Sequence, residues 1–218
     1  MTHFSDGVRV GRLFNTRSLP GAPMSPIYVY DVVPIALVTD GIALQQTVSG
    51  AGTLTLNGSL ASSGVVTLDV PRNVIVDAAG AATAVLTVTG TDVYGAAMSE
   101  AITLNGATAV AGQKAFKTIT SIANSATATD VFVGTGDVFG LPYRADGRGY
   151  VQTAWNNAFV TTGTFVAADT TSPATTTTND VRGTYAVPDA ADAVKRLTLY
   201  IYIEDADTQT GLYGVTQV

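Results

Sequence analysis

Between Pro71 and Arg144 the sequence repeats one pattern: short runs of Val, Ile, Leu, Thr and Phe separated by Gly, Asn, Asp and Ser. Residues of the first group favour extended strands, and residues of the second group mark tight turns. No segment of the chain keeps apolar residues at the 3.6-residue spacing of a helix. The sequence therefore predicts antiparallel strands joined by short loops, with very little helix.

Strands are also predicted on both sides of this stretch, most clearly where apolar and polar residues alternate, as at 53–57 and 197–203. The predicted strands are 35–38, 52–57, 65–70, 73–77, 84–89, 98–104, 113–122, 131–133, 164–168, 181–187 and 197–203. One helical turn is predicted at 190–194, with Asp189 as its cap. We expect an all-β fold: an antiparallel β-sandwich, for which jelly-roll, immunoglobulin-like and two-sheet Greek-key strand orders all remain open.

The first 34 residues differ from the rest because Gly and Pro are frequent there, which disfavours helices and long strands. Phe4, Leu13, Phe14 and Tyr28 nevertheless make the segment too apolar for a freely solvated tail. We expect two parts, an extended N-terminal arm at 1–34 that packs on something and a β-sandwich domain at 35–218.

Charged residues make up 13% of the chain, roughly half of the ~25% usual in soluble domains. A surface built from Thr, Ser, Asn and Gln suits broad protein–protein contacts, since few charges lose water when it is covered. Thr and Val also simply suit strands, and both explanations can hold together. The net charge of −6 argues against nucleic-acid binding. The cluster Arg9, Arg12 and Arg17 better fits an arm anchored on an acidic neighbour.

The chain contains no cysteine, which excludes disulfides and thiolate metal sites. No signal peptide is visible after Met1. The longest apolar run near the front, 32–38, contains Pro34 and is far too short to span a bilayer. We expect no membrane partner.

Candidate catalytic residues are few, so we expect a protein without enzymatic activity or cofactor. His3 is the single histidine, and only Glu100 and Glu204 are glutamates. The glycines of 134–140 have the spacing GxGxxxG and precede Leu-Pro rather than a helix, so a turn between strands is expected there instead of a phosphate loop. Acidic residues at 204–207 could bind calcium, but a solvated strand end is the better interpretation.

Several segments carry a likeness to a known family: TVTGTDVYGAAMSEAITLNG (87–106), GQKAFKTITSI (112–122), DVFVGTGDVFGLPYR (130–144), GTFVAADTTSPATTTTNDVRGTY (163–185) and AVKRLTLYIYIE (193–204). This part of the chain, from about Pro71 onward, resembles a β domain of tailed-bacteriophage virion structural proteins. The resemblance implies a capsid decoration (cement) protein, assembled in the host cytoplasm and placed on the outer surface of the head. It further implies a dimer or trimer whose partner is the major capsid protein.

For such a protein we expect binding rather than turnover, with the arm lying on the capsid surface. The predicted anchors are Phe4, Arg9, Arg12, Leu13 and Phe14, unless the arm folds back onto its own domain. Two alternatives stay open. One is a tail, neck or fibre-attachment component, and the other is a carbohydrate-binding β module that stacks sugar rings on Trp155, Tyr143 or Tyr150.

Overall fold

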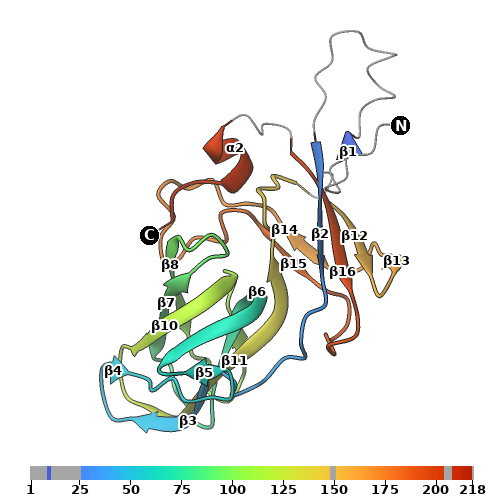
Figure 1. The fold of residues 1–218 in the computed structure, drawn as a ribbon. Helices are drawn as coiled ribbons and strands as arrows, with labels where there is room; N and C mark the ends of the chain where they lie inside the picture. The colour runs from blue at the N-terminus through green and yellow to red at the C-terminus, as the bar shows by residue number, and fades with distance from the viewer. Residues whose placement is uncertain (1–8, 11–25, 148–150, 204–207, 218) are drawn as a thin grey trace.

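The computed structural model describes residues 9–10, 26–147, 151–203 and 208–217, which form an all-β fold with one short helix (Figure 1). The strands are β1 (Arg9–Val10), β2 (Pro26–Val32), β3 (Ala43–Val48), β4 (Gly52–Thr53), β5 (Ala61–Ser62), β6 (Val65–Ala78), β7 (Val85–Thr91), β8 (Ala97–Thr103), β9 (Val110–Ala111), β10 (Phe116–Asn124), β11 (Ala128–Gly140), β12 (Val151–Trp155), β13 (Ala158–Phe159), β14 (Thr164–Val166), β15 (Thr184–Ala186) and β16 (Leu197–Tyr202), and the helix is α2 (Gln209–Tyr213). Their pairings are antiparallel. The predicted all-β antiparallel fold is confirmed.

The strands form two sheets. The smaller has the order β1-β2-β16-β12-β13, and the larger, of eleven strands, follows the path β14-β15-β11-β6-β10-β7-β8. Four short strands lie off this path, with β3 on β11, β4 on β10, and β5 and β9 on β6. In Figure 1 the larger sheet curls round the lower part of the molecule, and the smaller sheet stands at the upper right.

Two hydrophobic cores fill the molecule. The first contains Leu86, Ile119 and Ile122 inside the curled sheet. The second contains Trp155, Tyr185 and the inward residues of β16 beneath the smaller sheet. We call the residues around the first core (39–68 and 73–135) the first lobe, and those around the second core (26–32 and 139–217) the second lobe. β6 and β11 contribute residues to both cores and so join the lobes.

The β2 strand shows where the predicted N-terminal arm meets the folded domain. Pro26–Val32, which the sequence assigned to the arm, pairs along its length with β16 in the smaller sheet. Alternation explains why, since Tyr28, Tyr30 and Val32 pack against the second core while Val29 and Asp31 are exposed. Residues 1–8 and 11–25 lie outside the described part of the chain.

Two strands predicted on either side of Pro71 are a single strand. β6 runs for 14 residues through the proline. Its first half pairs with β10, its second half pairs with β11, and the β10 register shifts next to the proline. Pro71 lacks a backbone donor, and an irregularity in the ladder is where a strand tolerates that loss.

The glycines of 134–140 do not form the predicted turn. They lie inside β11, a 13-residue strand. A Cβ on Gly134 would come within 2.2 Å of the Val38 carbonyl oxygen, and one on Gly136 within 2.3 Å of Asn73 Oδ1. These glycines therefore allow close approach of neighbouring chain segments rather than a reversal of direction.

Residues 35–38, predicted as a strand, join the two sheets as an extended segment without a ladder. Ile35 N donates to Asp69 Oδ2 (2.8 Å), Val38 N donates to Thr135 Oγ1 (3.1 Å), and the Val38 carbonyl accepts from Thr135 N (3.0 Å). Two side-chain acceptors and one backbone bond thus satisfy the polar groups of this segment in place of a partner strand. The apolar residues of 35–38 alone do not show that these partners exist.

Side-chain hydrogen bonds also take the place of strand pairing in part of the strand predicted at 52–57. Only Gly52–Thr53 pairs as β4. Beyond it, the Gln46 side chain bonds both N and O of Thr55, at 2.9 and 3.0 Å, and Asn57 Oδ1 accepts from Leu44 N. Leu54 and Leu56 still point into the first core, so the predicted alternation of faces is confirmed.

The short helix lies at a different place from the one predicted. At 190–194 Ala193 has a left-handed φ of 65°, and Asp192 Oδ1 accepts from the amides of Val194 and Lys195 in a turn. The observed helix, α2, is capped by Thr208, whose hydroxyl accepts from Gly211 N at 2.8 Å. Five residues are too few to show a helical period in the sequence.

Candidate functional site

The predicted arm anchors fall largely outside the described residues. Phe4, Arg12, Leu13 and Phe14 lie there, and of Arg9 only the backbone is described, paired in β1 with Ile27. Their role stays a prediction. His3 and the acidic residues at 204–207 also lie outside the described part.

The aromatic residues named for sugar stacking have different environments. Trp155 is only 4% exposed and packs in the second core, with its indole N–H donating to Asp189. Tyr143 is half-buried between Tyr28 and Tyr213, with ring centroids 4.4 and 6.1 Å away. Tyr150 lies outside the described residues. Trp155 is therefore a core residue and presents no ring face to a ligand.

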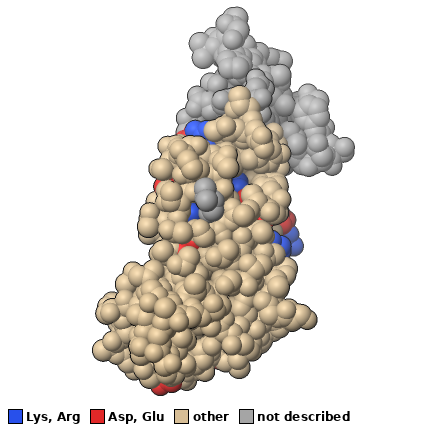
Figure 2. All heavy atoms as spheres, turned by 90° about the vertical axis from the view of Figure 1, so that its left-hand side faces the viewer, with Lys and Arg blue, Asp and Glu red and all other residues tan. Residues whose placement is uncertain are grey.

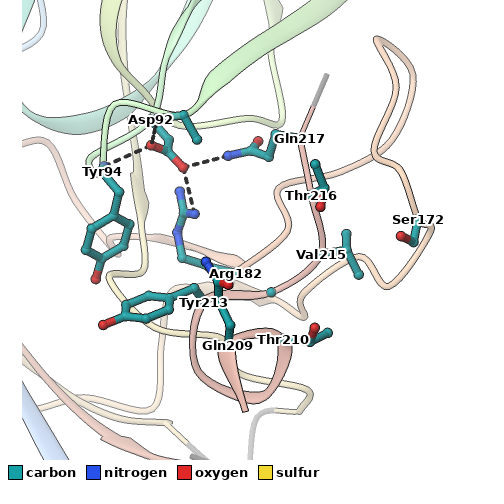
Figure 3. Close-up of a pocket in the computed structure, with 12 residues that line it drawn as sticks. Asp92, Tyr94, Ser172, Arg182, Gln209, Thr210, Tyr213, Val215, Thr216 and Gln217 are labelled. Atoms are coloured by element: carbon teal, nitrogen blue, oxygen red, sulfur yellow. Dashed lines mark hydrogen bonds and ion pairs between the residues drawn. The ribbon is translucent and has the colours of Figure 1, made fainter.

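A cavity of about 500 Å³ opens where the β7–β8 turn meets the C-terminal segment (Figure 3). Its wall combines segments far apart in sequence: Asp92, Tyr94, Ala96, Ser172, Arg182, Gln209, Thr210, Tyr213, Gly214, Val215, Thr216 and Gln217. The Thr-rich loop, residues 170–178, contacts the C-terminal segment, because Ala174 N donates to the Thr216 carbonyl at 2.9 Å. Sequence reasoning missed this site, since no local motif links its parts.

A buried ion pair forms one wall of the cavity. Asp92 Oδ2 accepts from Arg182 Nη1 at 2.9 Å and from Gln217 Nε2 at 2.8 Å. Asp92 Oδ1 accepts from the amides of Tyr94 and Ala96, which fixes the carboxylate within the turn. Arg182 Nε also donates to the Leu141 carbonyl at 3.2 Å. Both charges are thus bonded within the protein and neutralise each other.

Two tyrosines lie at one side of the cavity, opposite Ser172, Val215 and Thr216 in Figure 3. Tyr94 and Tyr213 meet edge to face, with centroids 4.9 Å apart, and are 50% and 36% exposed. The Arg182 guanidinium lies 5.4 Å from the Tyr94 ring centre. Burial raises the pKa of Tyr94, so its phenol stays protonated and donates to the Pro142 carbonyl at 2.6 Å.

A second group of buried charges lies beside the cavity. Glu100 Oε1 accepts from Gln113 N at 2.5 Å, and Lys114 Nζ donates to the Thr175 carbonyl at 2.6 Å. Burial raises the pKa of Glu100 to about 7, raises that of Asp180, and lowers that of Lys114. Each group bonds to backbone of another segment, so the cluster fastens the Thr-rich loop to β8 and β10.

The surface of the first lobe is nearly free of charge, and the tan lower half of Figure 2 shows one face of it. Residues 41–68, 78–91 and 118–129 contain no charged side chain. Exposed positions on β3 and at the start of β6 are instead Leu44, Gln45, Thr47, Val65 and Thr67, and the exposed Asp69 follows on β6. The uncharged segments of the chain therefore lie together in the first lobe.

The buried acidic side chains of the described residues make contacts within the fold. Among them, no group of three or more His, Asp or Glu side chains could hold a metal ion. No described helix has the length and apolarity to cross a bilayer. The buried carboxylates at 92, 100 and 180 all accept backbone amides, which is a structural use.

Comparisons of the chain with protein-family models, with curated proteins and with solved structures gave no match.

Proposed function

We propose that this chain is a structural protein of a tailed-phage particle, which decorates the outer face of the head and bridges major capsid subunits. The resemblance of 87–144 and 163–204 to phage virion β domains suggests the particle. The uncharged surface of the first lobe carries the proposal for how it binds.

That surface suits a broad, tight contact for a physical reason. Burying a charged group costs several kcal/mol unless it is paired, whereas Thr, Ser and Gln side chains lose less water and can bond to a partner. Around β3, β4 and β5 a partner can cover Leu44, Gln45 and Thr55 with few charged neighbours. Charged side chains beside this surface are Asp130, which bonds to Thr47, and the exposed Asp69 on β6. Repetition on a shell then multiplies a modest affinity per copy.

The test places charge on this surface and leaves the fold alone. Gln45→Lys with Thr67→Lys adds two cations at exposed strand positions whose side chains make no hydrogen bond within the described residues. Thr161→Lys, at an exposed position of the second lobe, is the matched control. Co-sedimentation with heads stripped of this protein should fall at least about tenfold for the double variant, which corresponds to roughly 1.4 kcal/mol, and stay unchanged for the control.

Three outcomes separate the alternatives. Equal binding by the double variant and the control would reject the first-lobe surface. Loss of binding after deletion of residues 1–20 would assign the contact to the predicted arm and its anchors. Failure of the wild-type chain to bind heads at all, with labelling confined to the tail in intact particles, would favour the tail or neck role.

A further inference from the structure

The cavity between the β7–β8 turn and the C-terminal segment has no part in the proposed shell contact, because it lies in the wall where the second lobe meets β7 and β8 (Figure 3). Its volume of about 500 Å³ falls within the range of roughly 300–1,000 Å³ in which small-molecule sites are found. We propose that it binds a neutral saccharide, one or two sugar rings in size.

Charge on the wall favours a neutral ligand. Arg182 and Asp92 are its charged residues, and they bond to each other at 2.9 Å. A ligand carboxylate would compete with Asp92 for Arg182, and a ligand cation would compete with Arg182 for Asp92. Either exchange breaks an existing buried pair, which costs more than a rim contact can return.

The polar groups of the wall favour a ligand rich in hydroxyls. Ser172, Thr210 and Thr216 offer hydroxyls that can donate or accept, and Gln209 offers an amide. Gln217 Oε1 is buried in the wall and has no hydrogen-bond partner among the described residues, although Nε2 of the same amide is held by Asp92. A ligand hydroxyl that reaches it after a small rotation of the amide would satisfy this acceptor.

The two tyrosines favour a ring with apolar faces. Tyr94 and Tyr213 keep half and about a third of their surface exposed, and their edge-to-face contact fixes both rings. An aromatic wall beside hydroxyl and amide groups matches a sugar, which combines C–H faces with hydroxyl edges. A purely apolar ligand would cover the same rings but leave the Ser and Thr hydroxyls without partners.

The experiment measures binding of neutral sugars to the full chain by saturation-transfer NMR. The probes are glucose, galactose, mannose and N-acetylglucosamine, with glucuronic acid as the charged comparison, each at about 10 mM, ten times a Kd of roughly 1 mM. At least one neutral sugar should bind saturably and more tightly than glucuronic acid.

Two variants assign the binding to this cavity. Tyr213→Ala removes one ring, and Thr210→Trp fills the opening from an exposed helix position without touching a side-chain hydrogen bond within the described residues. Each should weaken binding at least about tenfold. Phe159→Ala removes an aromatic ring that is 67% exposed on β13 and should change nothing. Thermal unfolding of each variant verifies that it is folded.

The proposal is overturned if no neutral sugar binds, if glucuronic acid binds as well as the neutral sugars, or if both cavity variants bind like the wild type. These outcomes are independent of head binding, so the saccharide site and the proposed virion role stand or fall separately.

Discussion

The two lobes of this protein differ in the length of their strands and in the number of their charged residues. The first lobe is built from strands in a curled sheet around an apolar core that includes Leu86 and Ile122, and its surface is nearly uncharged. Two of its buried charged residues, Asp92 and Lys114, bond to residues of the second lobe. The second lobe has shorter strands and long loops, and it holds more charged residues than the first lobe, including the pairs Arg144–Asp146 and Lys195–Asp189. Backbone pairing satisfies the polar groups of the regular strands, whereas irregular segments of either lobe, such as 54–57 and 180–183, also use side chains for this purpose.

Where the lobes meet, a few buried polar residues add contacts to the pairing of β6 with β11. Arg72 is fully buried and donates to the carbonyls of Gly136 and Ile35 and to Asp137 Oδ1. The Asp92–Arg182 pair similarly joins the β7–β8 turn of the first lobe to a loop of the second. Specific side-chain contacts therefore join the two lobes, and substitutions at these contacts should affect stability more than substitutions on the surface.

The largest effect is expected from Gly134→Ala. Its Cβ would lie 2.2 Å from the Val38 carbonyl oxygen, where the segment joining the two sheets crosses β11. We expect a loss of more than about 4 kcal/mol in the free energy of unfolding, because two backbone segments must separate. Gly80→Ala is the control, since nothing lies within 4 Å of its added Cβ. Urea denaturation measures both, and equal stability would contradict the close crossing.

Arg72→Met should lower the free energy of unfolding by roughly 3–5 kcal/mol, because it leaves Asp137 Oδ1 and the carbonyls of Gly136 and Ile35 without their donor. Arg196→Met is the matched control, because its pair with Asp31 is exposed on both sides and should contribute no more than about 1 kcal/mol. If the lobes depend on Arg72, the variant's unfolding followed by Trp155 fluorescence and by circular dichroism should separate into two transitions. A single unchanged transition would show that the strands alone join the lobes.

Glu100 should make stability depend on pH. Its pKa is raised to about 7 in the folded state by burial, so its contribution is fully present below its unfolded pKa, declines as pH rises through about 7, and then levels off. The total decline is roughly 3 kcal/mol, from the size of the shift. Glu100→Gln should flatten this part of the profile. The same change removes the Glu100 charge that raises the pKa of Lys114, so the Lys114 pKa should fall further in the variant. Urea midpoints between pH 4.5 and 8 that fall in parallel for wild type and variant would assign the decline to another group.

The smallest effect is expected on the first-lobe surface. Thr67→Lys alone should change the free energy of unfolding by no more than about 0.5 kcal/mol, because the side chain is exposed on β6 and has no hydrogen-bond partner within the described residues. Thermal unfolding at low and moderate salt measures this. A larger loss would mean that the absence of charge serves the fold itself rather than a partner.

Local regularity decided which elements could be predicted. In the β7–β8 hairpin, Val85 pairs with Thr103 and Thr91 with Ala97, as the predicted strands and the turn between them require. The inward face of β16, from Leu197 to Ile201, is fully buried as its alternation predicts. The hairpin and the buried face of β16 could be predicted because apolar and polar residues alternate in these strands and clear turn residues lie beside them.

The errors have a common cause, which is contact between residues distant in sequence. Gly134 and Gly136 were assigned to a turn because the segments that press against them, at 38–39 and at Asn73, are far away along the chain. The cavity was missed for the same reason, since Asp92, Arg182 and Gln217 meet only after folding.

The sequence by itself determined the all-β class, the faces of the regular strands and the low charge content, because each depends on composition or on neighbours two residues apart. Only the tertiary structure decided that the uncharged segments would share the surface of one lobe, that β6 would continue through Pro71, and that a cavity would form beside Tyr94 and Tyr213. These features depend on which strands pair. Burial of apolar surface stabilises many strand pairings to a similar degree, and specific close contacts such as those at Gly134 and Arg72 favour one pairing over the others.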